Sequence, residues 1–145
     1  MVPHNPEGEE KMANLAGFLK PTYTEKTIEV NISDRFLDDE GNPIPFKLKT
    51  VSHSKLKSLA NRSKKQGKKG EELDQSLFIA RCIVESCIQP DFHDVELCHA
   101  YNTEDPFELP EKMLLASEYE ALAKAFLDLN GNENEDLDVS KVTKN

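Results

Sequence analysis

The sequence of 145 residues lacks tryptophan, and its aromatic residues are seven Phe and three Tyr. Aromatic platforms on which bases or sugars stack are therefore not evident. No apolar run approaches the roughly 18 residues that a membrane-spanning helix needs, and the N-terminus lacks the basic-then-apolar order of a signal peptide. We therefore expect a soluble, cytoplasmic protein with no membrane partner.

Basic residues are also scarce, because 18 Lys and Arg face 27 Asp and Glu and leave a net charge of -9. This balance disfavours wholesale binding to nucleic acid or to an anionic membrane. The three cysteines, an odd number without a secretion signal, predict reduced thiols rather than a disulfide framework. The apolar share of 37% is low, so part of a chain long enough for one domain is expected to lie outside the core.

The two ends of the chain account for part of this low apolar share. Residues 1–11 hold almost nothing to bury, and the polar, acidic stretch 132–145 is similar, so the composition predicts a disordered leader, a domain over residues 12–131 and a disordered tail. A purine-rich stretch resembling a ribosome-binding site can encode residues 8–11. We hypothesise that Met12 is the native start.

The clearest strand pattern lies in two runs with an apolar residue at every second position: Ile28, Val30 and Ile32, then Ile44, Phe46 and Leu48. Residues 38–43 between them are rich in turn formers, including Gly41. The pattern predicts a hairpin with a long loop. Because a lone hairpin is marginal in water, its apolar face is expected to lie on helices.

Apolar spacing predicts helices over residues 12–19, 55–64 and 73–89, with Ser52 or Ser54 capping the second helix and a Gly- and Lys-rich interruption at 66–70. The helix at 73–89 is apolar over most of its circumference and is expected to be central to the core. Asp91 is predicted to cap a further short helix. The expected class is α+β, a mostly helical single domain with an N-terminal β-hairpin packed on a small helical bundle.

The last predicted helix begins near residue 117. Ser117 and Glu120 have the spacing of a capping box, in which each side chain satisfies a free backbone N–H. Tyr119, Leu122 and Phe126 share one face of this helix. Gly131 is expected to end it in a left-handed conformation.

Five sulfur- and nitrogen-bearing side chains invite a zinc hypothesis: Cys82, Cys87, His93, Cys98 and His99. There is no Cys-x-x-Cys pair, and Cys82 and Cys87 fall on different faces of an apolar helix. The favoured interpretation is therefore core thiols and surface histidines.

A calcium loop is suggested by alternating oxygen ligands at Asp128, Asn130, Asn132 and Asn134. The diagnostic sixth and twelfth positions hold Glu133 and Val139 instead of Gly and Glu, so the motif fails. Neither a G-x-S-x-G motif, nor a Gly-rich phosphate loop, nor H-E-x-x-H occurs. The sequence therefore predicts no catalytic, cofactor or metal residue and no enzyme.

One segment opposes the acidic balance. Residues 52–70 carry seven cations and no Asp or Glu, which leaves -16 on the rest of the chain. This basic segment could hold an acidic partner or a phosphate backbone, although a solvated helix end and loop explain it as well. Its cations are Lys55, Lys57, Arg62, Lys64, Lys65, Lys68 and Lys69.

A family resemblance rests on residues 32–49 (ISDRFLDDEGNPIPFKLK), followed by 97–101 and by 112–119 (KMLLASEY). Together these segments resemble the XkdN-like tail assembly chaperones of contractile-tailed phages and phage-like elements, over about residues 12–131. The family often has Gly where this chain has Asn102 and Ser117. Both substitutes tolerate a turn or a cap.

The resemblance implies a non-enzymatic helper that binds the tape measure protein before the tail tube polymerises around it, in the cytoplasm of the bacterial host. In related systems a ribosomal frameshift yields a longer product that is a further expected partner. The partner surface is expected where the hairpin meets the helices, and the same residues could instead simply fill the core. The candidates are Arg35, Phe36, Phe46, Met113, Leu114 and Tyr119.

Two other functions stay open from the sequence. The chain could be a structural connector or completion protein that remains in the virion. It could also be a small acidic regulator that uses the basic segment on nucleic acid. Homo-oligomers are compatible with each of these functions.

Overall fold

The computed structural model describes residues 14–19 and 25–131 of the chain. A helix lies at residues 14–19, within the predicted range 12–19. The strands that follow are β1 (Thr27–Val30), β2 (Phe46–Lys49), β3 (Lys64–Gly67), β4 (Gly70–Leu73) and β5 (Cys87–Gln89). The helices are α2 (His53–Asn61), α3 (Gln75–Ser86), α4 (Val95–Ala100), α5 (Leu109–Met113) and α6 (Ala116–Asn130). This mixture confirms the predicted α+β class. The predicted leader, the Met12 start and the tail after Gly131 lie outside the described residues.

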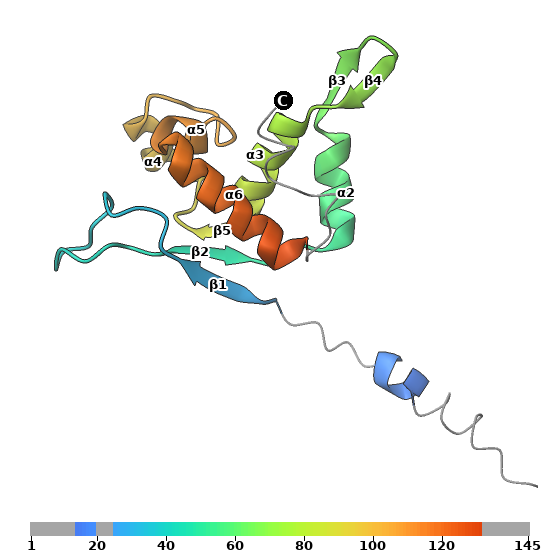
Figure 1. Cartoon of the computed structure of the whole chain (residues 1–145), viewed down its shortest axis with the longest axis horizontal. Helices are drawn as coiled ribbons and strands as arrows, with labels where there is room; N and C mark the ends of the chain where they lie inside the picture. Colours follow the sequence, from blue (N-terminus) through green and yellow to red (C-terminus); the bar gives the residue numbers. More distant parts are fainter. Residues whose placement is uncertain (1–13, 20–24, 132–145) are drawn as a thin grey trace, which may run out of the picture.

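The predicted N-terminal hairpin is confirmed. β1 and β2 pair antiparallel, with Ile28 opposite Leu48 and Val30 opposite Phe46 (Figure 1). Phe46 and Leu48 are buried, whereas Ile28 and Val30 on the outer strand are half-buried. The alternation read from the sequence therefore places one face of this ribbon in the core.

A third strand corrects the prediction of one helix over residues 73–89. The helix α3 ends at Ser86, and β5 pairs antiparallel with β2, which makes β2 the central strand. The proline at position 90 disfavours helical backbone at Gln89, the residue before it. The Gln89 side chain also donates a hydrogen bond of 2.7 Å to the Pro45 carbonyl. A short apolar run before a proline suits a buried helix or a strand, and here pairing with β2 decides the outcome.

The helices cover the sheet and build the core with it. Helix α6 packs on α3 and on strands β1 and β2 (Figure 1). The apolar character of α3 is confirmed as a core feature, because its residues from Ile79 to Val84, apart from the half-buried Arg81, are buried. The most completely buried apolar side chains come from many elements: Leu48, Leu59, Ile83, Phe92, Leu109 and Leu122. Each contributes about 1.5–3 kcal/mol by leaving water.

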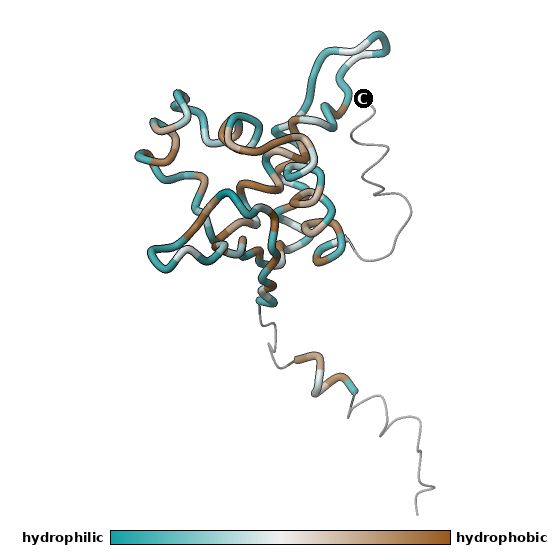
Figure 2. Tube along the Cα trace, turned by 60° about the vertical axis from the view of Figure 1, so that its left-hand side comes forward, coloured by the Kyte–Doolittle hydropathy of each residue, from teal (hydrophilic) through white to brown (hydrophobic). Residues whose placement is uncertain are grey.

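A second hairpin lies where the sequence predicts only an interruption at residues 66–70. β3 and β4 pair antiparallel around the two-residue turn Lys68-Lys69, and Gly70 takes a φ of +105°. The side chain of Glu72 crosses over Gly67, where a Cβ would lie only 2.2 Å from the Glu72 Cδ. Both strands are polar, so no apolar alternation signals them. The hairpin projects from α2 and α3 and is hydrophilic at its tip (Figures 1 and 2).

The caps of two helices can be compared with their predictions. The Ser52 hydroxyl accepts a hydrogen bond of 3.2 Å from the Lys55 N–H, which confirms Ser52 as the cap of α2. For α4 the cap is Asp94, which accepts from the Leu97 N–H at 2.9 Å, and not Asp91. Asp91 instead accepts from the His93 N–H in the turn that precedes the helix.

The ends of α6 differ from the prediction in two respects. The helix begins at Ala116, and Glu118 rather than Glu120 accepts a hydrogen bond from the Leu115 N–H, at 2.8 Å. The Ser117-to-Glu120 capping box is therefore wrong, because Ser117 already lies inside the helix. At the other end Gly131 has φ -93° and ψ -7°, a right-handed conformation, and not the predicted left-handed stop.

Candidate partner surface

The long loop between β1 and β2 is held by its own backbone and by one aspartate. The Asp38 carboxylate accepts hydrogen bonds from the N–H groups of Glu40 and Asn42, both at 2.9 Å, and Gly41 takes a φ of +83° at the tip. Below the tip, the Ile44 N–H donates to the Phe36 carbonyl at 2.8 Å. The turn chemistry seen in the sequence thus fixes the position of Arg35 and Phe36 at the base of the loop.

Arg35 joins this loop to the corner between α5 and α6. Its guanidinium donates two hydrogen bonds to the Glu118 carboxylate, one of them from Nε at 3.2 Å, and a third to the Met113 carbonyl at 3.1 Å. Because Glu118 also accepts from the Leu115 N–H, one carboxylate holds both the start of α6 and the loop. A bidentate arginine–carboxylate pair is directional, so it fixes the angle between the two elements. We call this region the Arg35 junction.

The charges of the junction stabilise each other. The hydrogen bonds from Arg35 are the main cause that lowers the pKa of Glu118 to about 2, against an ordinary value of 4.5; burial opposes the shift, and Ser33 and the Leu115 N–H add to it. The hydrogen bond to Glu118 in turn raises the pKa of Arg35. The Glu118 side chain is only 10% exposed, whereas that of Arg35 is 45% exposed. The pair therefore has a buried acid and a cation that reaches solvent.

An aromatic ring contacts the arginine of the pair. The Arg35 guanidinium lies 4.8 Å from the centre of the Phe36 ring, a distance suited to a cation–π contact. Phe36 in turn contacts the buried ring of Phe46, with 6.0 Å between ring centres. Tyr119 is half-buried beside Glu118 in sequence, and its burial raises the pKa of its phenol to about 12. Aromatic residues and arginine are enriched at protein–protein interfaces.

The six predicted partner residues divide into two groups. Arg35 is exposed and Phe36 and Tyr119 are half-buried, whereas Phe46, Met113 and Leu114 are only 2%, 7% and 8% exposed. The last three belong to the core, which is the alternative that the sequence left open for them. Their role as partner anchors is untested.

Three residues of the junction were not among the sequence candidates. Sequence patterns do not single out Glu118, because a lone carboxylate on a helix gives no signal of a long-range partner. Leu37 and Leu115 are large apolar side chains that are 53% and 58% exposed, the first in the loop two residues after Arg35 and the second in the α5–α6 corner. The sequence does give a signal for Leu37, because it is an apolar residue beside the acidic run 38–40.

The cysteines occupy the core, as expected. Cys82, Cys87 and Cys98 are buried free thiols, and burial raises the pKa of both Cys82 and Cys87 to about 12. His93 and His99 are exposed, and the His93 ring packs edge-on against Phe107. Among residues 14–19 and 25–131, no group of three or more His, Cys, Asp or Glu side chains is placed to hold a metal ion.

Asn130, from the motif that fails as a calcium loop, has a structural role. Its side-chain oxygen accepts a hydrogen bond from the Val51 N–H, and its amide donates to the Phe126 carbonyl at 3.2 Å. These bonds tie the end of α6 to the start of α2. Asn132 and Asn134 lie outside the described residues.

The basic segment divides between α2 and the second hairpin. Lys55 is half-buried, and its Nζ lies 3.6 Å from a Glu85 carboxylate oxygen. The other six side chains are exposed: Lys57, Arg62, Lys64, Lys65, Lys68 and Lys69. The strand β4 adds Glu71 and Glu72 opposite Gln66 and Lys65, so the hairpin is less uniformly basic than the segment 52–70 alone.

In the part of the chain that the structure describes, no helix combines the length and apolar character that crossing a membrane requires.

Comparison with known proteins identifies the family of the chain. Residues 15–143 match the family described as "Phage XkdN-like tail assembly chaperone protein, TAC". Two similar proteins come from Bacillus subtilis (strain 168). The phage-like element PBSX protein XkdN is 33% identical over an alignment of 146 positions that covers 96% of this chain and 99% of XkdN. The uncharacterized protein YqbN is 34% identical over 143 residues, covering 94% and 96% of the two chains.

The fold has a matching solved structure as well. The crystal structure of the protein YqbN superposes with a TM-score of 0.70 at 31% identity, over 92% of this chain and 100% of that chain. Two of the three segments that carry the resemblance in the sequence, 32–49 and 112–119, meet at the Arg35 junction. The chain belongs to the family of phage XkdN-like tail assembly chaperones.

Proposed function

We propose that this tail assembly chaperone binds the tape measure protein and keeps it soluble and competent for assembly of the tail tube. Its role in tail assembly follows from its family. The observation that supports a binding role is the Arg35 junction, where a fixed charged pair contacts the Phe36 ring and exposed leucines lie in the same loop and at the same helix start. A tape measure protein is a long helical chain with apolar stripes, and an amphipathic helix is recognised through such apolar side chains beside a groove.

The partner surface that we propose consists of Arg35, Phe36, Leu37, Leu115 and Tyr119, and we call it the junction surface. Phe46, Met113 and Leu114 lie beneath it and support it. The arginine offers a charged contact at the centre, and its partly exposed guanidinium has donors left for a carbonyl or a carboxylate.

The remaining parts of the proposal follow the class. Phage tail assembly chaperones are in general not enzymes, and we propose that this chain carries out no catalysis, works in the cytoplasm of the bacterial host, and needs neither a cofactor nor nucleic acid. A frameshifted longer form of the chain stays a prediction as a second partner.

Co-expression with the tape measure protein of the same phage or phage-like element tests the proposal. We expect the tape measure protein to be largely insoluble alone and to become soluble and co-purify when this chain is present. Mass spectrometry of purified particles adds a second criterion, because a chaperone should be absent from them. A tape measure protein that is soluble alone and never co-purifies would contradict the proposal, and a chain retained in finished particles would identify a connector instead.

A further inference from the structure

The second hairpin carries more positive than negative charge, because its four lysines outnumber Glu71 and Glu72 on β4. Lys64 and Lys65 lie on β3, and Lys68 and Lys69 form the turn. All four side chains are exposed. Within residues 14–19 and 25–131, the ion pairs found involve other lysines and Arg35, and none of these four. Glu72 lies opposite Lys65, whereas no carboxylate is paired across from the turn Lys68-Lys69, so the hairpin presents a basic tip.

A segment of opposite charge follows the core helix α3. Residues 91–111 hold seven carboxylates and no Lys or Arg. Residues 52–70 have the opposite composition, with seven cations and no carboxylates. All seven carboxylates belong to exposed residues: Asp91, Asp94, Glu96, Glu104, Asp105, Glu108 and Glu111. This acidic segment includes α4 and the start of α5.

The two charged regions cannot reach each other within one molecule. The hairpin lies before the N-terminal end of α3, and the acidic segment comes after β5, which follows the other end of that helix. In Figure 1 they stand on opposite sides of the body, with β3 and β4 to the right and α4 and α5 to the left. Mutual neutralisation therefore requires a second molecule.

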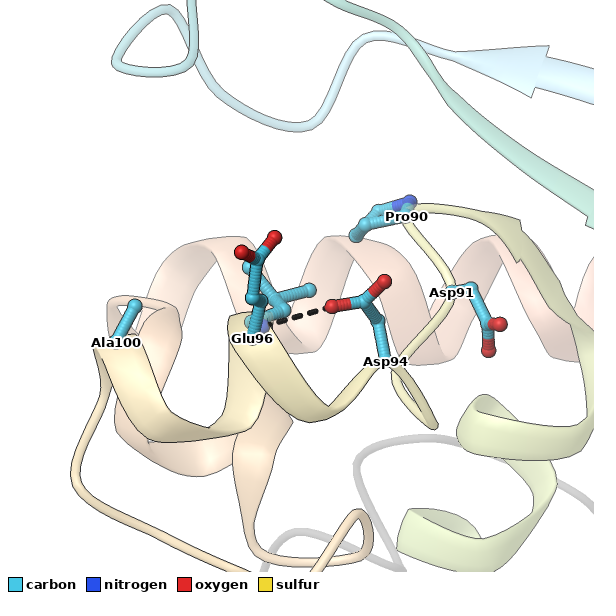
Figure 3. Close-up of a pocket in the computed structure, with 6 residues that line it drawn as sticks. Pro90, Asp91, Asp94, Glu96 and Ala100 are labelled. Atoms are coloured by element: carbon cyan, nitrogen blue, oxygen red, sulfur yellow. Dashed lines mark hydrogen bonds between the residues drawn. The ribbon is translucent and has the colours of Figure 1, made fainter.

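The acidic segment has a hollow suited to a lysine side chain. An open groove of about 430 Å³ is lined by Pro90, Asp91, Asp94, Glu96, Leu97 and Ala100. Figure 3 shows the carboxylates of Asp94 and Glu96 rising from α4 on the side that faces Pro90, while that of Asp91 points away. The aliphatic stem of a lysine can pack on apolar groups such as Leu97 and Pro90 while its ammonium group meets the carboxylates.

We propose that the chain self-associates head to tail, with the β3–β4 hairpin of one copy bound to the acidic segment of the next. A second copy is the occupant favoured by charge, because each molecule carries both complementary regions. Nucleic acid is disfavoured, since the -16 outside the basic segment repels a polyanion that approaches the body. A contact between two different surfaces leaves one of each free at the ends, so copies form an open row or a ring.

Paired charge reversals test this proposal independently of the tape measure protein. In sedimentation velocity of the purified full chain at about 0.05 M salt, we expect concentration-dependent self-association that is lost near 0.5 M salt, where screening acts over a few ångströms. Lys68→Glu with Lys69→Glu should weaken the association at least about tenfold, as should Glu96→Lys with Glu104→Lys. None of these four side chains caps a helix. A mixture of the two reversed proteins should associate again, because each then meets its complement.

The control is Lys26→Glu with Lys124→Glu, which changes the net charge by the same amount at exposed positions outside the hairpin. This variant has the same net charge as the hairpin reversal. It should self-associate clearly more strongly than the hairpin reversal. A wild-type chain that is monomeric at low salt overturns the proposal. This holds also if that monomeric chain binds a DNA duplex through its hairpin. Equal loss in the control, or no recovery in the mixture, also overturns it.

Discussion

The Arg35 junction and the β3–β4 hairpin are built by opposite means. At the junction, Arg35 and Glu118 are 83 positions apart in the sequence, and their pairing depends on the whole core between them. The hairpin pairs residues that are at most nine positions apart, and its strands are exposed and polar. The junction therefore shares in the stability of the fold, whereas the charge of the hairpin can be changed with little loss of stability.

The largest effect is expected where the junction rests on the core. Replacing Phe46 by Ala removes a side chain that is 2% exposed and contacts the Phe36 ring. We expect the free energy of unfolding to fall by about 3–5 kcal/mol, measured by urea denaturation. A loss below about 1 kcal/mol would mean that the sheet and the loop are not packed as described.

A smaller effect is expected from the charged pair. Glu118→Gln keeps the shape of the side chain but removes the charge to which Arg35 donates, and we expect a loss of about 1.5–3 kcal/mol at neutral pH. The comparison between pH values is more specific. The pKa of Glu118 is about 2 in the folded chain against an ordinary 4.5, so its stabilisation is complete above pH 4.5 and is lost as the pH falls through 2.

The wild-type chain should therefore lose more unfolding free energy than Glu118→Gln between pH 4.5 and 2. Urea denaturation at a series of pH values measures both proteins. Glu120→Gln serves as the matched control, because Glu120 is exposed and lies two residues after Glu118 in α6. Its stability should follow that of the wild type. Parallel curves for wild type and Glu118→Gln would show that the pair does not form in solution.

The smallest effect on stability is expected at the hairpin tip. Lys68→Ser with Lys69→Ser should leave the free energy of unfolding within about 0.5 kcal/mol of the wild type, because both side chains are exposed and unpaired with the described acids. Thermal unfolding followed by circular dichroism checks this. A large loss would show that the hairpin is part of the cooperative core, and the contrast between the two regions would fail.

Much of the fold could be predicted from periodicity and turn chemistry. The alternation around Ile28 and Leu48 located β1 and β2, and the apolar circumference of residues 79–84 located the core of α3. Residue patterns of this kind work because a strand or helix on a core must show apolar side chains at its own period. The Arg-Phe and Glu-Tyr segments also indicated the part of the chain that forms the junction.

Other features depend on contacts that a local pattern cannot show. The strand β5 has the composition of a helix end and becomes a strand through pairing with Leu48 and Lys47. The second hairpin has no apolar alternation, because it projects into solvent. Phe46, Met113 and Leu114 were candidate anchors by residue type, but only the packing of loop, α5 and α6 reveals that they are buried. The pairing of Arg35 with Glu118 is likewise a product of the tertiary fold.

The most direct test of the account measures how tightly the tape measure protein binds to altered forms of the junction surface. Leu37→Asp with Leu115→Asp places charge on two exposed apolar side chains, one two residues after Arg35 and one at the start of α6, without touching the core. Val95→Asp is the matched control, since Val95 is 65% exposed at the start of α4. We predict that the double variant folds normally but binds at least about tenfold more weakly, while the control binds like the wild type. Undiminished binding by a folded double variant would contradict the claim that this surface holds the tape measure protein.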